Sequence, residues 1–257
     1  MIDTHAHLYL DAFSEDLVEV VDRARSEGVH RIYLPNIDSS HTDSLKKLAS
    51  SFDGLFYPMM GLHPCSVKSD NHLDELAHVE KEIDNNPGYY YAIGEIGVDL
   101  YWDKSTQQLQ EEAYRRQIDL ARQHSLPIII HSRESLDITI SIMKEKQKGD
   151  LKGIFHCFNG SVEQGKRIID LGFNLGIGGV VTFKNAGVDK VVAELPLGSM
   201  VLETDAPYLT PAPFRGKRNE SSYIRYVASR ISELHGITMT EVIDKTTENA
   251  LSIFHNA

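Results

Sequence analysis

The chain has 257 residues, of which 41% are hydrophobic and 25% charged, and its formal net charge is −11 at pH 7. Two cysteines are too few for a disulfide scaffold, and the acidic balance argues against nonspecific nucleic-acid binding through a basic surface. The sequence has neither a charged-then-apolar leader nor an apolar run near the roughly 18 residues of a membrane span, so we expect a cytoplasmic protein with no membrane partner.

Short apolar runs alternate with helical patterns along the first part of the chain. We predict strands over residues 2–7, 31–35, 56–62 and 90–94, and helices over residues 16–27, 39–51 and about 73–83. The first helix is typical: Leu17, Val20, Val21 and Ala24 recur at the i, i+3, i+4, i+7 spacing of one helical face. Gly28 follows at the position where a glycine commonly ends a helix.

The same alternation continues to the end of the chain. We predict strands over residues 127–130, 153–155, 173–181 and 200–202, and helices over residues 106–124, 136–143, 161–171, 188–194, 223–234 and 238–254. Ser161 with Gln164, and Thr238 with Glu241, have the spacing of capping boxes and mark two helix starts.

Eight apolar runs alternating with helices at a spacing of roughly 25 to 35 residues predict a parallel (β/α)8 barrel, with residues 1–257 as a single domain. The alternative is an open, doubly wound sheet. No G-x-G-x-x-G follows the first strand, which argues against a dinucleotide-binding version of that fold.

Polar residues recur where the predicted strands end, although fully buried strands are expected to be apolar throughout. They are His5, His7, His63, Glu95, His131, His156, Glu203 and Asp205. A single buried polar side chain is usually a hydrogen-bonded core residue, but eight at one end of a barrel are better explained by a site, because barrel sites form at the carboxyl ends of strands.

Two pairs in this set point to metal. His5 with His7, and Glu203 with Asp205, are two residues apart, so each pair is expected to face inward from an extended segment. Two carboxylates on one face repel unless a cation or proton lies between them. Histidine and carboxylate ligands without thiolate suit zinc, manganese or magnesium, and the number of ligands allows two divalent ions. Glu95, about midway round the barrel, is the natural bridging carboxylate.

The order of the motifs resembles one family closely. D-x-H-x-H at residues 3–7, G-L-H-P at 61–64, G-E-I-G-V-D at 94–99, I-H-S-R at 130–133, H-C-F-N-G at 156–160 and E-T-D-A-P-Y-L at 203–209 together are similar to the TatD family of metal-dependent DNases. That family belongs to the amidohydrolase-like barrels, and the match covers nearly the whole chain.

The resemblance implies a binuclear centre and an activity on DNA. It implies that one metal takes His5, His7 and Asp205, that the second takes His131 and His156, and that Glu95 bridges both. His63 and Glu203 correspond to positions on the inner rim. We expect Asp205 to hold and deprotonate the attacking water, with Glu203 or His63 assisting, and the resemblance favours stepwise removal of nucleotides from a 3′ end of DNA.

Basic residues follow the predicted fifth, seventh and eighth strands, beside the metal ligands: Arg133, Lys184, Arg215, Lys217 and Arg218. Each alone would be a surface charge, but together they suit phosphate recognition, for which arginine offers a bidentate fork. Asn159 and Gly160 precede a capped helix and can add backbone N–H donors. Trp102 and Tyr208 are candidates for base stacking, or for loop packing.

The chain departs from the family pattern at Leu100, where an aromatic is usual, and at Ser221, where proline is usual. An alternative function is an amidohydrolase-type C–N or ester hydrolase of the same superfamily. Many binuclear members of that superfamily bridge their metals with a modified lysine on the fourth strand, and Glu95 here favours phosphodiester chemistry. A binding protein without turnover is a third class, against which the complete ligand set argues. No protein partner can be read from the sequence.

Overall fold

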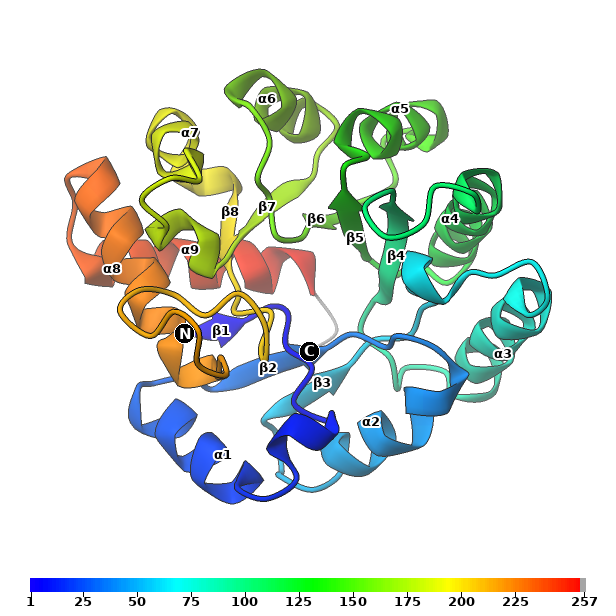
Figure 1. The fold of residues 1–257 in the computed structure, drawn as a ribbon, viewed down its shortest axis with the longest axis horizontal. Helices are drawn as coiled ribbons and strands as arrows, with labels where there is room; N and C mark the ends of the chain where they lie inside the picture. Colours follow the sequence, from blue (N-terminus) through cyan, green and yellow to red (C-terminus); the bar gives the residue numbers. More distant parts are fainter. Residues whose placement is uncertain (255–257) are drawn as a thin grey trace.

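Eight short parallel strands form the centre of the structure, a computed structural model that describes residues 1–254 (Figure 1). The strands are β1 (Ile2–Asp3), β2 (Arg31–Leu34), β3 (Phe56–Pro58), β4 (Ile93–Asp99), β5 (Ile128–Arg133), β6 (Gly153–Phe155), β7 (Asn174–Ile177) and β8 (Met200–Leu202). Strand and helix alternate from β1 to β8, as the sequence predicts.

All the helices except the last surround the strands on the outside (Figure 1). The helices are α1 (Leu17–Ser26), α2 (Thr42–Ala49), α3 (His72–Asn85), α4 (Gln107–Gln123), α5 (Leu136–Lys146), α6 (Val162–Asp170), α7 (Val188–Glu194), α8 (Ile224–His235) and α9 (Met239–Ile253). Short 3-10 helices lie at η1 (Asp11–Phe13), η2 (Ser39–His41), η3 (Pro64–Ser66), η4 (Gly179–Thr182), η5 (Leu197–Ser199) and η6 (Ser221–Tyr223). Both predicted capping boxes are present, at the starts of α6 and α9.

The strands form two hydrogen-bonded sheets, β1-β2-β3 and β4-β5-β6-β7-β8. Isolated bridges join them into a closed barrel: Met60 pairs with Ile93 on one side, and Ala6 pairs with Ala206 on the other. The second seam lies between the segments that carry the predicted ligands. The Asp205 N–H donates to the His5 carbonyl at 2.9 Å, and the His7 N–H donates to the Ala206 carbonyl at 2.7 Å.

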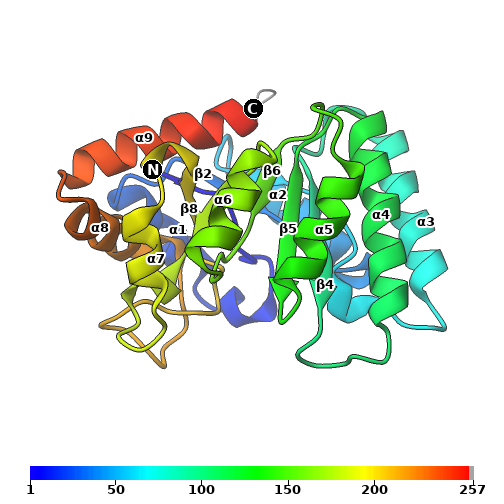
Figure 2. The same cartoon turned by 90° about the horizontal axis from the view of Figure 1, so that it is seen from above.

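Apolar residues fill the amino-terminal end of the barrel, and α9 lies across that end (Figure 2). Tyr33 of β2 stacks on Phe254 with ring centroids 3.8 Å apart. The loops that follow β4, β7 and β8 lie at the opposite end (Figure 2). The barrel therefore has one closed end and one polar end, and the polar end is where barrel sites form. Among residues 1–254, no helix has the length and apolar character needed to cross a bilayer.

Five predicted strands differ from the observed ones by more than one residue at an end. The third, predicted over residues 56–62, ends at Pro58, and the fifth, predicted over residues 127–130, extends to Arg133. The strand predicted over residues 2–7 is regular only as β1, and the chain continues extended with Ala6 as a single bridge. The fourth strand begins and ends later than residues 90–94, so Glu95 lies inside β4. The seventh, predicted over residues 173–181, ends at Ile177 and turns into η4, where the backbone of Gly179 lies so close to the Leu209 carbonyl that a Cβ would be 2.1 Å from it.

Candidate metal centre

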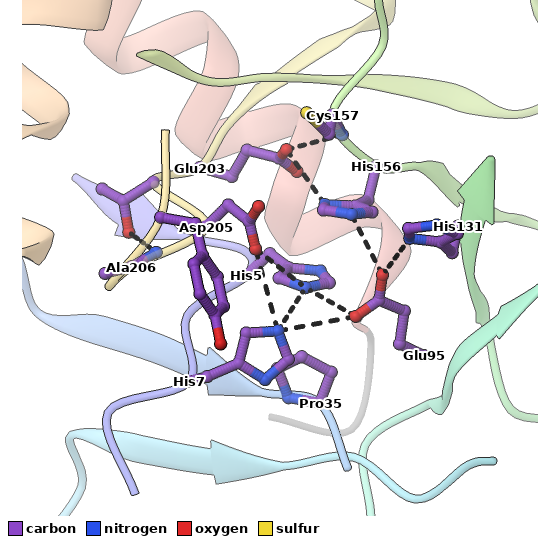
Figure 3. Close-up of polar contacts among 12 residues, drawn as sticks. His5, His7, Pro35, Glu95, His131, His156, Cys157, Glu203, Asp205 and Ala206 are labelled. Atoms are coloured by element: carbon purple, nitrogen blue, oxygen red, sulfur yellow. Dashed lines mark hydrogen bonds and ion pairs between the residues drawn. The ribbon is translucent and has the colours of Figure 1, made fainter. Parts of the chain in front are cut away.

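The eight polar residues predicted at the strand ends converge at the open end of the barrel. Figure 3 labels all of them except His63. His5 and His7 follow β1, His63 follows β3, and His156 follows β6. Glu95 lies in β4 and His131 in β5, while Glu203 and Asp205 follow β8. Six of the eight elements of the barrel therefore contribute to one cluster, which agrees with the arrangement that the sequence predicts.

Glu95 lies at the centre of this cluster, and its two carboxylate oxygens face different imidazoles. Its Oε2 is 3.1 Å from His5 Nε2 and 3.5 Å from His7 Nε2. Its Oε1 is 2.7 Å from His131 Nδ1 and 3.1 Å from His156 Nε2. The carboxylate thus divides the four predicted histidine ligands into two pairs, one for each oxygen, as a bridging ligand would.

The histidines of the first pair approach each other with the same nitrogen. His5 Nε2 and His7 Nε2 are 3.2 Å apart. Two nitrogens on one tetrahedral zinc ion, each at roughly 2.0–2.1 Å, lie about 3.3 Å apart. The spacing of this pair therefore fits two ligands of a single ion.

Hydrogen bonds to the outer ring nitrogen fix the orientation of His7 and of His156. The Tyr9 hydroxyl donates to the Pro35 carbonyl at 2.6 Å, so its oxygen accepts from His7 Nδ1 at 2.9 Å. His156 Nδ1 lies 3.2 Å from Glu203 Oε1. These partners engage the outer nitrogen of each ring, so the inner nitrogen faces Glu95 and is the one that a metal would bind.

His131 is held from both sides by carboxylates of β4. Its Nδ1 faces Glu95, and its Nε2 lies 2.9 Å from Asp99 Oδ2. The hydrogen bond and charge of His131 oppose the effect of burial on Asp99 and bring the pKa of that carboxyl down to about 2. Asp99 belongs to the G-E-I-G-V-D motif but was not among the predicted site residues.

The charges in the cluster are strongly coupled. Burial favours the neutral form of Glu95, but the neighbouring His156, His5 and His63 outweigh it and hold the pKa of Glu95 well below its ordinary value. Burial also opposes the charge on His156, yet Glu95 and Glu203 raise the pKa of His156 well above normal. Burial and His156 lower the pKa of His5. The cluster thus holds protons that a bound cation would displace.

Asp205 stands at the more open side of the cluster. Its side chain is 15% exposed, and its Oδ1 lies 3.8 Å from His5 Nε2 and 3.7 Å from His7 Nε2. Burial raises the pKa of Asp205 to about 6, with His156 and His7 acting in the opposite direction. Its backbone has φ of 57°, a left-handed conformation that Asp and Asn adopt more readily than most residues.

His63 faces the same carboxylate from a third direction. Its Nδ1 accepts from the Cys65 N–H at 3.0 Å, which assigns the ring proton to Nε2. That Nε2 lies 3.5 Å from Glu95 Oε1. Burial opposes the charged ring, but Glu95 raises the pKa of His63 above its ordinary value.

Three groups of side chains bring potential ligand atoms together. They are His5, His156 and Asp205; His5, His7 and Glu95; and His63, Glu95 and His131. The donor set of imidazoles and carboxylates fits zinc, manganese or magnesium. His63 joins the third group, whereas the resemblance pairs His131 with His156 only, so His63 lies closer to a ligand position than the sequence indicates.

Four of the predicted phosphate-binding residues keep their charges available. Arg133, Lys184, Arg215 and Lys217 are exposed, and within the described residues no carboxylate lies at ion-pair distance from them. Arg215 stacks on Phe183, 3.5 Å from the ring centroid.

Arg218 behaves differently from its neighbours. Its guanidinium bonds both carboxylate oxygens of Asp16 at 2.7 Å and the Ala12 carbonyl at 2.6 Å. The Arg218 side chain therefore anchors the loop after β8 to the segment before α1, and its charge is already paired.

Two open grooves are lined in part by residues of the segments that follow β5, β6 and β7. One, of about 310 Å³, is lined by Asn159, Ser132 and Glu134 among others. The other, of about 460 Å³, is lined by Lys184, Phe183 and residues of α7 and α8. Neither contains a predicted metal ligand. At the start of α6, the capping box already uses the N–H groups of Ser161 and Gln164, so these two groups are not free to bind a phosphate.

Gly176 gives a test of the contact between Glu203 and His156. A Cβ at Gly176 would lie 2.2 Å from Glu203 Oε2, whereas a Cβ at Gly178 would approach the same side chain no closer than 3.6 Å. We expect Gly176→Ala to displace Glu203 and lower metal affinity about 10- to 100-fold, the usual effect of losing an outer partner. Gly178→Ala is the matched control, and metal titration of both proteins gives the comparison. Equal affinities would show that Glu203 does not orient His156.

Comparison with known proteins agrees with this centre. A family model described as TatD related DNase matches residues 2–255. The metal-dependent hydrolase YabD of Bacillus subtilis is 42% identical over 255 residues, covering 99% of this chain and 98% of that protein.

Solved structures give the same result. The crystal structure of YjjV, a TatD homologue from Escherichia coli, is similar with a TM-score of 0.92 at 30% identity, covering 99% of this chain and 98% of that one. A TatD family hydrolase from Entamoeba histolytica has a TM-score of 0.85 at 26% identity, covering 100% and 98% of the two chains. The chain belongs to the TatD family of metal-dependent hydrolases, as its motifs, barrel and family match all indicate.

Proposed function

We propose that this protein is a metal-dependent deoxyribonuclease that hydrolyses DNA phosphodiester bonds stepwise from a 3′ end, with two divalent ions. The observation that carries the proposal is the position of Glu95, whose two oxygens each face one pair of the four predicted histidine ligands. The unpaired cations around this cluster, in a chain of net charge −11, support a phosphate-bearing substrate.

In this proposal each histidine pair belongs to one ion. His5, His7 and Asp205 would hold the first ion, His131 and His156 the second, and Glu95 would bridge them. Bound divalent ions would supply a polarised phosphoryl oxygen and a water of lowered pKa.

The chain's own residues would then move the protons. Asp205 is close to the ligand pair yet partly open to solvent, so its carboxylate can accept a proton from the attacking water. His63 carries its proton on Nε2, directed toward the cluster, and can donate it to the departing 3′ oxygen when the P–O bond breaks. Asp205 thus acts as the general base and His63 as the general acid.

Glu203 is better suited to orientation than to direct assistance. Its side chain is fully buried, and its Oε1 accepts from the Cys157 N–H at 2.6 Å and lies beside His156 Nδ1. A carboxylate behind the ring cannot reach a substrate in front of it. Of the two candidates to assist Asp205, we therefore choose His63.

The test is activity on end-labelled single-stranded DNA beside a panel of amides and lactones, using metal-loaded protein. A 3′–5′ exonuclease shortens a 5′-labelled strand into a ladder and releases the 3′ label as a mononucleotide at once. Cleavage of the amides or lactones with the DNA left intact would reject the proposal in favour of the C–N or ester hydrolase.

Arg215 provides a prediction about phosphate binding. Arg215→Ala removes an exposed, unpaired guanidinium, and we expect kcat/KM on DNA to fall roughly 10- to 100-fold, as when a charge-assisted hydrogen bond is lost. Metal content should not change. Arg116→Ala is the control, because Arg116 is paired with Glu80 on the outer helices. An unchanged kcat/KM in Arg215→Ala would make Arg215 an ordinary surface charge.

A further inference from the structure

The exposed aromatic side chains of the described residues gather at one end of the barrel. Within residues 1–254 they are Tyr101, Trp102 and Tyr208, exposed by 49%, 72% and 53%. All three lie in loops that follow strands at the open end, the first two after β4 and the third after β8. Large exposed aromatic groups concentrated beside one site indicate a binding surface.

Tyr101, Trp102 and Arg133 form a continuous group, which we call the aromatic platform. The two rings meet edge to face, with centroids 4.8 Å apart and an interplanar angle of 89°. The Arg133 guanidinium lies 3.7 Å from the Tyr101 centroid and 5.5 Å from that of Trp102. The platform thus combines ring faces with a cation that no described carboxylate neutralises.

Packing of the loop does not account for the platform. Leu100, the residue before it, is only 8% exposed and belongs to the hydrophobic core. Trp102 is the most exposed large hydrophobic residue among those described. The loop is therefore anchored by Leu100, and the Trp102 ring, together with the part of Tyr101 that Arg133 does not cover, can contact a ligand.

The platform is tied directly to the metal centre through Asp99. Asp99 Oδ1 accepts from the N–H groups of Tyr101 at 2.9 Å and Trp102 at 3.4 Å, while its Oδ2 contacts His131. Arg133 lies two residues beyond His131 on β5, so both side chains leave the same face, about 7 Å apart along the strand. A substrate whose phosphodiester lies at the metal centre therefore needs only a few further bonds to reach the platform.

We propose that the aromatic platform binds an unpaired base of the substrate strand, next to the nucleotide whose phosphodiester lies at the metal centre; this rests on the function proposed above. Single strands bind proteins through aromatic rings that stack on bases and cations that hold phosphates, and the platform offers both. A base engaged in a duplex cannot present its face in this way, so the platform also selects single-stranded ends.

The chain supplies its own reporter for this contact. Trp102 is the one tryptophan in the sequence, so tryptophan emission comes from the platform alone. We would titrate metal-loaded protein with a phosphorothioate oligothymidylate, which resists cleavage, and with an abasic strand of the same length and charge. We expect saturable quenching by the oligothymidylate, about tenfold weaker binding of the abasic strand, and no quenching by it. Equal binding and quenching by both strands would overturn the proposal.

Variants separate stacking from general damage. Trp102→Ala should raise KM for a single-stranded oligonucleotide about tenfold, while the metal content measured by elemental analysis stays at the wild-type value, because the ring contacts the substrate and no metal ligand. Trp102→Phe keeps a ring and should restore most of the affinity. Leu73→Ala, an equally exposed apolar change on α3, is the control. An unchanged KM in Trp102→Ala would also overturn the proposal.

The outcomes keep this proposal apart from the DNase assignment. Loss of the Trp102 effect, with wild-type protein still cleaving the oligonucleotide, rejects the platform alone. A wild-type protein that neither binds nor cleaves the oligonucleotide rejects both the DNase assignment and the platform.

Discussion

Asp205→Asn is expected to give a folded, metal-binding protein that hydrolyses DNA about 10² to 10⁴ times more slowly, the usual effect of removing a general base. Asn keeps the shape of the side chain and one oxygen for a metal. It also tolerates the left-handed backbone at this position, where φ is 57°, so the substitution adds little strain. The loss should therefore appear in kcat and only weakly in the melting temperature.

The measurement is kcat and metal content on the same preparation. Asp119→Asn is a matched control, because Asp119 of α4 pairs with Lys146 of α5 on the outer helices. The opposing reading is that Asp205 only supports the following Ala-Pro turn, whose Tyr208 N–H donates to the Asp205 carbonyl. A variant that retains more than about a tenth of wild-type kcat per metal-loaded molecule would favour that reading.

The sequence predicted the barrel well because hydrophobic patterning repeats eight times. Helix α7 and strands β6 and β8 fall on the predicted residues. The errors lie where short strands depend on pairing rather than on composition. β1 has only two residues because the chain beyond them hydrogen-bonds alternately to β2 and to the segment after β8, and so forms a regular ladder with neither.

The convergence of the site could be predicted because parallel strands of a barrel end at one rim. Its outer partners were missed for a local reason. Asp99 is four residues beyond Glu95, so the period-two spacing of an extended strand places it on the face that His131 approaches, whereas Tyr9 follows His7 within a turn that hydrophobic patterning does not indicate. The fourth strand was predicted to end near Glu95, whereas β4 extends to Asp99, so Asp99 was not expected to be part of the strand.

Contacts between distant segments could not be predicted in this way. Arg218 lies beside Arg215 and Lys217 in sequence, yet it pairs with Asp16, about 200 residues earlier, and only the packing of the last loop against the first helix reveals this. The role of Glu203 has the same origin. Its spacing from Asp205 suggested a shared task, but Gly176 on β7 leaves space for its carboxylate behind His156.

Glu95→Ala is expected to reduce the metal content from about two divalent ions per chain to one or fewer, with a nearly complete loss of DNA hydrolysis. The reason is that both carboxylate oxygens are committed: Oε2 faces His5 and His7, and Oε1 faces His131. Glu95→Ala therefore removes one ligand from each histidine pair. It also removes the negative charge that lies between the imidazoles, so any protonated imidazoles repel one another.

Asp99→Asn is the informative control, because Asp99 is the other β4 carboxylate that contacts His131. As an outer partner it orients the ring, so this variant should still bind about two ions, with affinity lowered about 10- to 100-fold. Elemental analysis after reconstitution gives the stoichiometry, and metal titration gives the affinity. Two ions bound at wild-type affinity in Glu95→Ala would show that Glu95 does not bridge them. One ion in Glu95→Ala and two in Asp99→Asn would show that Glu95 binds metal directly, whereas Asp99 only orients His131.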